Sequence, residues 1–551
     1  MQSSWHDTVA FNNNYRILIF FLLPGLLVFF LRKKGQKHTN PPHPWPKVPG
    51  ALPFIGNSLE GGILYIADNL EQWARQYGSE SGVFDCTLFG KTFVVLCNEE
   101  KLTFVDNNRP YKITRRKKFS DVMKSTGADG IFSADGEQWR KDRRMVAPFL
   151  NRKSVKDYVS GVKIVAGRLV NKWEETMERD GFVNINPDLM LATIDVISLV
   201  AYAKDINGLM KGGQAVRLGK DMKSLAQKSV YRVFSPFSYW NIPIVGQYLD
   251  GLGWARSRML KYMKNIVRDY ETSPLSKSES EVKQSFLGKV IMHSKQDNAH
   301  INSDRLIGNL VTFFAAGSET TFNTICFALY ELCMDTTGLQ EELAAEILAM
   351  KGLETYVDLE SLNDGLPRLR SFVYEVLRYQ GTVPFMGLES QEPLELDGCL
   401  LPAGTCFFMM MRYVTTLEAS IAHAEKSTPR GPRDAPADKF CPRRWLISNE
   451  DKGDTKNNED GDGDGDGKDA QGNNLSVTSP TYQTGFRMFG SSLRVCPGRG
   501  LAEVEIVVFL AFILSKFKIE LQEGHPKMKP VMKIALSPDI DIHLMLKPRI
   551  T

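Results

Sequence analysis

The chain has 551 residues, of which 43% are hydrophobic and 24% are charged, and its 68 Lys and Arg against 64 Asp and Glu give a net charge of +4. This length and composition exclude a disordered or collagen-like chain and predict a globular protein with a large core. The small, scattered positive charge does not indicate a nucleic acid partner. Because the eight cysteines include no C-x-x-C pair, we expect free thiols rather than a disulfide framework or a zinc site.

The first element is an apolar run without charges, Ile17–Leu31, followed directly by the basic residues Arg32, Lys33, Lys34 and Lys37. As a helix rising about 1.5 Å per residue it covers roughly 22 Å, and snorkelling flanks extend it toward the ~30 Å hydrocarbon core. A cleaved signal peptide is the alternative, but the positive charges follow the run and no small-residue cleavage site comes after it. We therefore predict that residues 1–37 are a single-pass membrane anchor that leaves the rest of the chain in the cytosol.

A proline-rich segment, residues 38–57, follows the anchor with Pro41, Pro42, Pro44, Pro46, Pro49 and Pro53. Proline fixes φ and cannot continue a helix, so this composition predicts a stiff, extended hinge. The body of the protein then begins near residue 58.

The body has mainly helical periodicity with short strand-like runs. We predict a β-hairpin of residues 83–89 and 92–97 around Gly90 and Lys91. Helices are predicted at 67–77, 153–179, 215–229, 254–271, 305–334 and 367–379, and a small sheet within 394–411.

The segment 449–474 is rich in Asp and Gly. Its D-x-D-x-D-G start at Asp462 resembles a calcium-binding loop, but the twelfth position is Asn473 rather than Glu, and no amphipathic helices flank it. Asp and Gly bury too little apolar surface to order a segment, so we predict a disordered acidic insertion at about 449–476.

Cys496 lies in the loop F-G-S-S-L-R-V-C-P-G, residues 489–498, directly before an apolar helix predicted at 501–516. A thiolate is a strong ligand of haem iron, and the positive end of a helix favours its anionic form. Gly498 permits close approach to a flat macrocycle. The pattern F-x-x-x-x-R-x-C-x-G, which includes Phe489 and Arg494, resembles the haem-binding loop of the cytochrome P450 family, the haem-thiolate monooxygenases.

Three further motifs follow the same family in order and spacing. Glu375 and Arg378 form an E-x-x-R pair, and the resemblance implies that Arg444, in F-C-P-R-R-W, locks to them in a buried cluster. Residues 316–321 (A-G-S-E-T-T), in the middle of the long apolar helix, are similar to the family's oxygen-binding segment. Residues 139–143 (W-R-K-D-R) resemble the helix that binds the haem propionates.

The resemblance covers nearly the whole chain and implies the cytochrome P450 fold, mainly α with small β-sheets, in a catalytic domain at 58–551. It implies haem b as cofactor, with Cys496 as the proximal iron ligand. It implies that the rest of the cofactor site includes Phe489, Arg494, Gly498, Trp139, Arg143 and Gly317, the last leaving room for dioxygen. Thr320 and Glu319 are the implied catalytic pair, the hydroxyl holding dioxygen and the carboxyl feeding protons.

Because the chain has no flavin or nicotinamide fingerprint, electrons must come from outside. For a membrane-anchored member the resemblance implies NADPH-cytochrome P450 reductase, and allows cytochrome b5 as a further partner, at the endoplasmic reticulum membrane; other organelle membranes stay open. The substrate is expected to be lipophilic (a sterol, carotenoid, fatty acid or terpenoid), in an apolar pocket lined by Phe313, Phe314, Ala316, Val383, Pro384, Phe385 and Met386.

Two alternatives stay open at this point. One is a haem-dependent isomerase or dehydratase of the same fold, and the other is a non-enzymatic haem-binding membrane protein. The chain also departs from the family pattern. Ser492 stands where the loop usually has Gly, Asp438 replaces the usual Pro-Glu before the F-C-P-R-R-W segment, and Leu388 stands where many members have a propionate-binding Arg.

Overall fold

The computed structural model describes residues 43–52, 55–58, 62–235, 237–272, 285–296, 303–350, 365–417, 438–448, 475–477 and 485–549. The predicted anchor at 1–37 lies outside the described residues, as does the predicted acidic insertion up to residue 474. The described end of the proline-rich segment packs on the body, because Val48 N donates to Asp85 O at 2.9 Å and Trp45 Nε1 donates to Asp85 Oδ1 at 2.7 Å.

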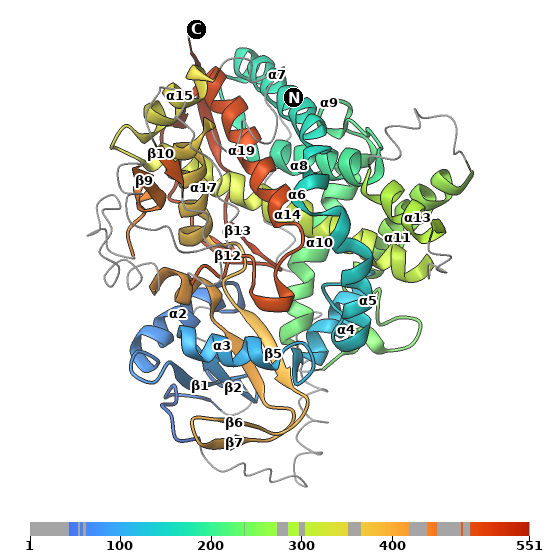
Figure 1. The fold of residues 1–551 in the computed structure, drawn as a ribbon, viewed down its shortest axis with the longest axis vertical. Helices are drawn as coiled ribbons and strands as arrows, with labels where there is room; N and C mark the ends of the chain where they lie inside the picture. The colour runs from blue at the N-terminus through green and yellow to red at the C-terminus, as the bar shows by residue number, and fades with distance from the viewer. Residues whose placement is uncertain are drawn as a thin grey trace.

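The helices account for most of the described structure (Figure 1). They are α2 (Ile66–Tyr77), α3 (Glu99–Asn108), α4 (Lys117–Thr126), α5 (Gly136–Val146), α6 (Arg152–Lys156), α7 (Val159–Asp180), α8 (Ile185–Tyr202), α9 (Gly208–Lys211), α10 (Gln214–Phe234), α11 (Leu252–Thr272), α13 (Phe286–Gln296), α14 (Ser303–Met334), α15 (Leu339–Ala349), α17 (Pro367–Gln380) and α19 (Arg499–Lys516).

The strands form small sheets, the largest of which lies at one end of the molecule (Figure 1). That sheet has the order β1 (Val83–Leu88), β2 (Lys91–Leu96), β8 (Cys406–Met409), β5 (Met386–Ser390) and β3 (Ile113–Arg115). The others pair β11 (Phe517–Leu521), β14 (His543–Pro548) and β4 (Val183–Asn184); β9 (Leu446–Ser448) and β10 (Leu475–Val477); β12 (Pro530–Met532) and β13 (Leu536–Pro538); and β6 (Leu394–Leu396) and β7 (Cys399–Leu401). The mainly helical fold with small sheets confirms the predicted fold class.

Several predicted boundaries were wrong. The hairpin turns at Phe89 and Gly90, one residue early, because these two residues take the positive φ values of 48° and 73° that a tight hairpin needs. The predicted helix 153–179 breaks between α6 and α7 at Tyr158, whose ring is buried and whose hydroxyl donates to Phe149 O at 2.9 Å. β10 begins at Leu475, inside the predicted insertion, because it pairs with β9. The predicted small sheet within 394–411 is divided, since β8 joins β2 and β5.

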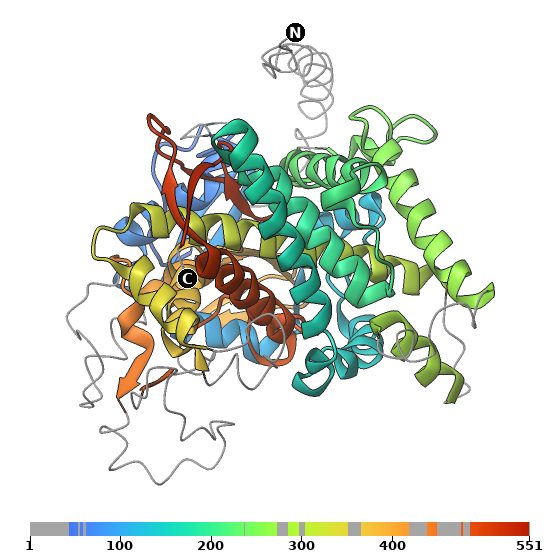
Figure 2. The same ribbon diagram turned by 90° about the horizontal axis from the view of Figure 1, so that it is seen from above.

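The long helix α14 runs through the middle of the helical part and contacts α8, α11, α17 and α19. Helices α7 and α19 lie side by side (Figure 2), and α19 also contacts α14. Among the described residues α8 is long and apolar enough to cross a membrane, with a mean hydropathy of 1.3, but 72% of it is buried inside the protein. It is therefore an interior helix, which contacts α14 along one side.

Candidate functional site

The loop before α19 holds the Cys496 backbone in place. Cys496 N donates to Phe489 O at 2.7 Å, and Gly490 and Ser492 take positive φ values of 76° and 51° within the turn. A short 3₁₀ turn, Ser492–Arg494, precedes Cys496, and Gly498 is the residue that caps α19. Ser492, which stands where the loop usually has glycine, therefore lies in the left-handed region of backbone conformation.

The thiol of Cys496 lies in a position suited to an anion that binds a metal. Cys496 has exposed surface, but desolvation by the protein around it raises its pKa. The backbone N–H of Gly498, the Arg143 guanidinium, and the guanidinium and backbone N–H of Arg499 act in the opposite direction. These groups favour the thiolate, and a bound metal cation would offset the cost of burying its negative charge.

Two exposed residues, one just before α19 and one in the middle of α14, lie next to buried neighbours. Cys496 is exposed in the chain alone, although the helix that follows it is largely buried. Ala316 in α14 is also exposed, although Phe314 and Ser318 on either side are fully buried. Because α14 and α19 pack on each other, these open positions fit a prosthetic group held between the two helices.

Near this loop the structure gathers four arginines, Arg109, Arg115, Arg143 and Arg494. Arg143 Nη1 donates to Val495 O at 2.6 Å, while Arg494 Nη1 donates to Ala134 O at 3.0 Å. Burial and the neighbouring Arg115 and Arg109 lower the pKa of Arg494 to about 8. Burial and Arg109 likewise lower the pKa of Arg115 to about 9.

The arginine cluster has too little negative charge around it. Asp135 opposes the repulsion at Arg494, with 3.5 Å between Arg494 Nη2 and Asp135 Oδ1. Arg115 Nε and Arg109 Nε and Nη2 are buried and have no hydrogen-bond partner in the described part of the chain. Buried cations and buried N–H groups without hydrogen-bond partners are stabilised by anions, so the cluster fits the two propionates of haem.

Sequence reasoning identified Arg143 and Arg494 but missed Arg109 and Arg115. The antiparallel register pairs Arg115 on β3 with Leu388 on β5 as Cα partners. Position 388, where many family members have an arginine, is a leucine in this chain. The buried Arg115 lies beside it on the neighbouring strand. The basic run 115–118 was visible in the sequence, but only the strand pairing shows which member turns inward.

Trp139, on α5, is buried with only 6% of its surface exposed. The Arg494 guanidinium carbon lies 4.8 Å from the centre of its ring, within the range of a cation–π contact. Trp139 and Arg143, one turn apart on α5, therefore both reach the arginine cluster. Phe489 lies under Arg499, whose guanidinium carbon is 5.3 Å from the ring centre.

The oxygen-binding segment lies in the middle of α14. Thr320 Oγ1 donates to Ala316 O at 2.7 Å. Burial raises the pKa of Glu319 to about 7, and the Lys533 ammonium acts against this shift. A side chain at Gly317 would place its Cβ 3.1 Å from Ile197 Cδ1 of α8. The glycine therefore allows α14 to pack closely on α8, and the predicted space for dioxygen stays a prediction.

The E-x-x-R cluster is as predicted, and it is buried. Arg378 donates to both carboxylate oxygens of Glu375, at 2.7 and 2.8 Å, and Arg444 Nε lies 3.1 Å from both. Cys441 N and Trp445 Nε1 also donate to Glu375, at 2.7 and 3.0 Å. The predicted partnership of Arg444 with this pair is confirmed.

Two residues of the predicted substrate pocket belong to the core. Phe314 is fully buried, with its ring centre 6.1 Å from that of Tyr262. Phe385 is 8% exposed and meets Phe408 edge-on, with ring centres 5.1 Å apart. Ala316, by contrast, is exposed.

Removing the charge of Arg115 tests its part in the site. Arg115 is buried and its Nε has no hydrogen-bond partner in the described part of the chain. We therefore expect Arg115→Met to lower the affinity for haem by about tenfold, the contribution of one charged hydrogen bond. The rate of haem transfer to excess apomyoglobin measures this. Arg140→Met, which changes a side chain 57% exposed on α5, is the control. Equal transfer rates for the two variants would contradict a role for Arg115.

Comparisons with known proteins show which family the chain belongs to. The cytochrome P450 family model matches residues 46–426 and 436–545. Cytochrome P450 71A20 of Arabidopsis thaliana is 24% identical over 524 residues, which is 90% of this chain and 90% of that protein. Cytochrome P450 2J5 of Mus musculus is 23% identical, with 95% and 92% covered. Mitochondrial sterol 26-hydroxylase of Mus musculus is 24% identical, with 75% and 72% covered.

Among solved structures, that of a cytochrome P450 designated CYP102L1 matches with a TM-score of 0.69 and 20% identity. The match covers 93% of this chain and all of that one, and it shows the fold. Together with the family model, which spans most of the sequence, these relatives settle the classification. The chain belongs to the cytochrome P450 family, whose members are monooxygenases that bind haem b through a cysteine thiolate.

Proposed function

We propose that this chain inserts one oxygen atom of O₂ into a lipophilic organic substrate, with Cys496 as the thiolate ligand of the haem iron. The observation that carries the proposal is the placement of Cys496, which is exposed just before a buried helix and whose thiol faces the N–H groups of Gly498 and Arg499. When bound, haem supplies the oxygen-activating chemistry of the family.

The residues of this chain then have separate tasks. Phe489 fixes the cysteine loop through its carbonyl, and Gly498 caps the helix behind the thiol. Trp139, Arg143 and Arg494, with Arg109 and Arg115 added, hold the propionates. Gly317 lets α14 approach α8, and we keep the prediction that it also leaves room for dioxygen.

Glu319 and Thr320 form the proposed proton path. With a pKa of about 7, the Glu319 carboxyl both holds and releases a proton near neutral pH. The Thr320 hydroxyl now donates to Ala316 O, beside the exposed Ala316 position. Rotating away from that carbonyl would let it donate a hydrogen bond into the open space next to it.

Electrons come, in this proposal, from NADPH-cytochrome P450 reductase, with cytochrome b5 as an optional second donor. The apolar run Ile17–Leu31 and the basic cluster after it support a single-pass anchor in the endoplasmic reticulum membrane, with the catalytic domain in the cytosol. A membrane-held enzyme meets substrates that partition into lipid, which supports a lipophilic substrate.

Thr320→Ala separates a monooxygenase from a haem-dependent isomerase. Loss of the hydroxyl should leave folding and haem content nearly unchanged, because a single hydrogen bond contributes about 1 kcal/mol. Proton delivery should slow by about 10²–10⁴, the usual contribution of a positioned acid. NADPH oxidation should then continue while less product and more hydrogen peroxide are formed.

The measurement is the ratio of oxygenated product to NADPH consumed, with reductase present. Ser318→Ala is the matched control, because Ser318 Oγ makes the same kind of bond to the carbonyl four residues back, at 2.8 Å to Phe314 O, but is fully buried. Thr320→Ser should restore coupling. If Thr320→Ala and Ser318→Ala gave the same ratio as the wild type, the proton path would be wrong.

A further inference from the structure

The turn between β12 and β13, residues 533–535, places a charged side chain partly inside the protein. Lys533 N donates to Ala535 O at 3.0 Å within the turn. Leu536 N, which follows the turn, donates to Thr382 O at 2.8 Å. Since β13 also contacts α14, the turn is held beside that helix. Lys533 is half-buried in this position, whereas lysine side chains mostly lie at the surface.

The turn is fixed on another side by Ile534, the residue after Lys533. Ile534 packs against a small apolar cluster of Val122, Met123 and Trp240. These contacts and the hydrogen bond that follows the turn hold its backbone from two directions. The fold therefore sets the place of the Lys533 side chain.

Four titratable groups act on Lys533, and they come from three parts of the fold. Burial lowers the pKa of Lys533 first, while Glu319 of α14 opposes this shift and Lys223 of α10 adds to it. Asp541, just before β14, and Cys326 of α14 also oppose it, with smaller effects. Glu319 is thus the strongest opposite charge that the Lys533 ammonium faces.

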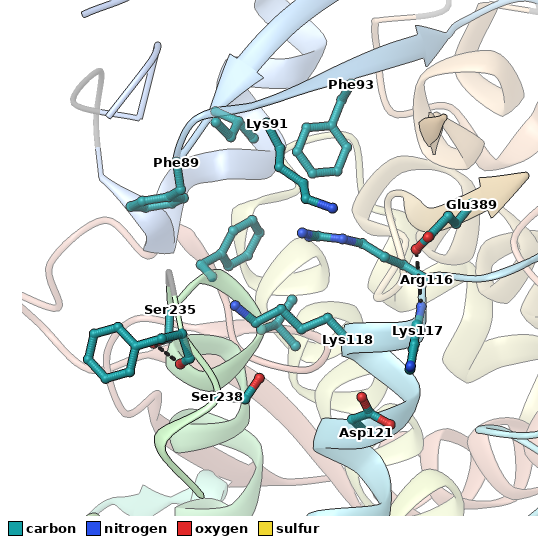
Figure 3. A pocket seen from close by; sticks show the side chains of 14 residues that line it. Phe89, Lys91, Phe93, Arg116, Lys117, Lys118, Asp121, Ser235, Ser238 and Glu389 are labelled. Atoms are coloured by element: carbon teal, nitrogen blue, oxygen red, sulfur yellow. Dashed lines mark hydrogen bonds between the residues drawn. The ribbon is translucent and has the colours of Figure 1, made fainter. Parts of the chain in front are cut away.

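The same interaction acts on Glu319. Burial raises the pKa of Glu319 to about 7, and Lys533 is the charge that opposes this rise. In the described part of the chain neither charged group forms a hydrogen bond or an ion pair. The basic residues Lys91, Arg116 and Lys118 line a separate cavity between the β1–β2 hairpin, the start of α4 and the end of α10 (Figure 3), and they do not act on Glu319.

This arrangement suits a carboxyl that has to exchange protons. A carboxyl buried without a cation stays protonated well above neutral pH, because burial disfavours its charged form. A carboxylate in a direct ion pair with an ammonium stays ionised instead and is a poor proton donor. An ammonium that faces the carboxyl without bonding to it gives a situation between these two, so Glu319 both releases and regains a proton near neutral pH.

We propose that Lys533 is a positioning residue for proton delivery, which keeps the Glu319 carboxyl able to give a proton to Thr320 and to take another from solvent. The O–H bond of the carboxyl breaks as its proton passes to the Thr320 hydroxyl oxygen, and the hydroxyl gives up its own proton into the open space next to Ala316. A proton from solvent restores the carboxyl, and Lys533 keeps its proton throughout. The inference rests on the proposed function, because it concerns the control of that same proton path.

The test is a titration of the Glu319 carboxyl in the full-length, haem-loaded protein without reductase or NADPH. Infrared difference spectroscopy follows the C=O stretch of the protonated carboxyl, which Glu319→Gln removes and so identifies. We expect Lys533→Met to raise the midpoint of this titration by about one pH unit, because an opposite charge close to a carboxyl lowers its pKa by about 1–3. Lys533→Arg keeps the positive charge, so its midpoint should stay close to that of the wild type.

Lys118→Met is the matched control. Lys118 is also half-buried, and its Nζ lies 5.9 Å from the ring centre of Trp240, in the cluster that holds Ile534. The variant removes the same charge near the same turn from a residue that does not act on Glu319, so the midpoint should be that of the wild type.

A second measurement leaves Lys533 in place. The interaction between two groups is reciprocal, so loss of the carboxylate should lower the pKa of Lys533. Slightly above neutral pH, where the wild-type carboxyl is ionised, we expect Glu319→Gln to make Lys533 react about tenfold faster with acetic anhydride, because more of the amine is then uncharged. Mass spectrometry reads the acetylation, and the rate at Lys118 should not change.

The pH dependence of turnover separates a positioning role from a structural one. The protonated Glu319 is the donor in the proposed proton path, so the ratio of oxygenated product to NADPH consumed should fall as the pH rises through its pKa. Lys533→Met should move the midpoint of that fall upward by about one pH unit, and Lys533→Arg should restore it. A side chain that only stabilised the fold would change the haem content without moving the midpoint.

Two results of the titration would overturn the inference: a Glu319 midpoint that Lys533→Met leaves unchanged, or one that Lys118→Met moves equally. A shifted titration with an unshifted pH dependence of turnover would also overturn it, because Lys533 would then have no part in proton delivery. Absence of oxygenated product from the wild type would instead overturn the proposed function, and the proton role of Lys533 with it. The two failures are therefore distinguishable.

Discussion

Replacing Cys496 by serine should abolish the red-shifted absorption band that thiolate-ligated haem shows when reduced and bound to carbon monoxide. A serine hydroxyl is not ionised near neutral pH, so the anionic ligand is lost while the side chain keeps its size. Cys496 is exposed, and the hydrogen bond from its backbone N to Phe489 O does not depend on the sulfur. The variant should therefore fold, with its circular dichroism spectrum unchanged.

The control for this substitution is Cys399→Ser, which changes a half-buried thiol on the small strand β7 and should keep the band. Haem content, measured by pyridine haemochrome, separates loss of the ligand from loss of the cofactor. A Cys496→Ser protein that kept the wild-type band would show that another of the eight thiols binds the iron.

Glu375→Gln should destabilise the folded protein by more than most single substitutions do. Glu375 is completely buried and accepts hydrogen bonds from Arg378, Arg444, Cys441 N and Trp445 Nε1. The amide has no charge, so two buried guanidinium groups lose their counter-ion, and breaking a buried ion pair from one side costs about 3–5 kcal/mol. The whole free energy of unfolding of a protein is about 5–15 kcal/mol, so this loss is a large fraction of it.

The measurement is the midpoint of urea unfolding, followed by circular dichroism and by release of haem. Glu342→Gln is the matched control, because it breaks the exposed pair of Arg443 and Glu342, whose side chains are 59% and 40% exposed, and such pairs contribute only about 0–1 kcal/mol. If the two variants unfolded at the same urea concentration, the cluster would not stabilise the fold. Replacing Arg378 and Arg444 by methionine in the Glu375→Gln variant should recover part of the lost stability.

The sequence predicted those elements whose local signals and tertiary environment agree. The apolar run that becomes α14 and the proline that opens α17 were both found within a few residues. The helix α8 was missed because a helix buried on nearly all sides has no amphipathic pattern. The break at Tyr158 was missed because the partner of its hydroxyl, Phe149 O, is set by the tertiary fold.

The site was predictable to the extent that its residues lie in contiguous motifs. Cys496, Glu319 and Thr320 stand in short recognisable segments, whereas Arg115 reaches the site only through the pairing of β3 with β5. The pocket residues Phe314 and Phe385 were assigned by their position along the chain, but packing against Tyr262 and Phe408 makes them core. Which way a side chain turns is decided by its neighbours in space.

The serine at 492, with its φ of 51°, has a consequence for how this loop can vary. A residue with a Cβ in the left-handed region costs the folded state roughly 1–2 kcal/mol. A glycine there avoids this strain, but it also gives the unfolded chain more conformational freedom, which costs about 0.4–1 kcal/mol on folding. The second effect offsets only part of the first, which leaves glycine favoured by roughly 0–1.6 kcal/mol, a difference small enough for the fold to tolerate serine at this turn. The geometry around Cys496 is therefore compatible with more sequences than a pattern requiring glycine at 492 would admit, and such a pattern would pass over this chain.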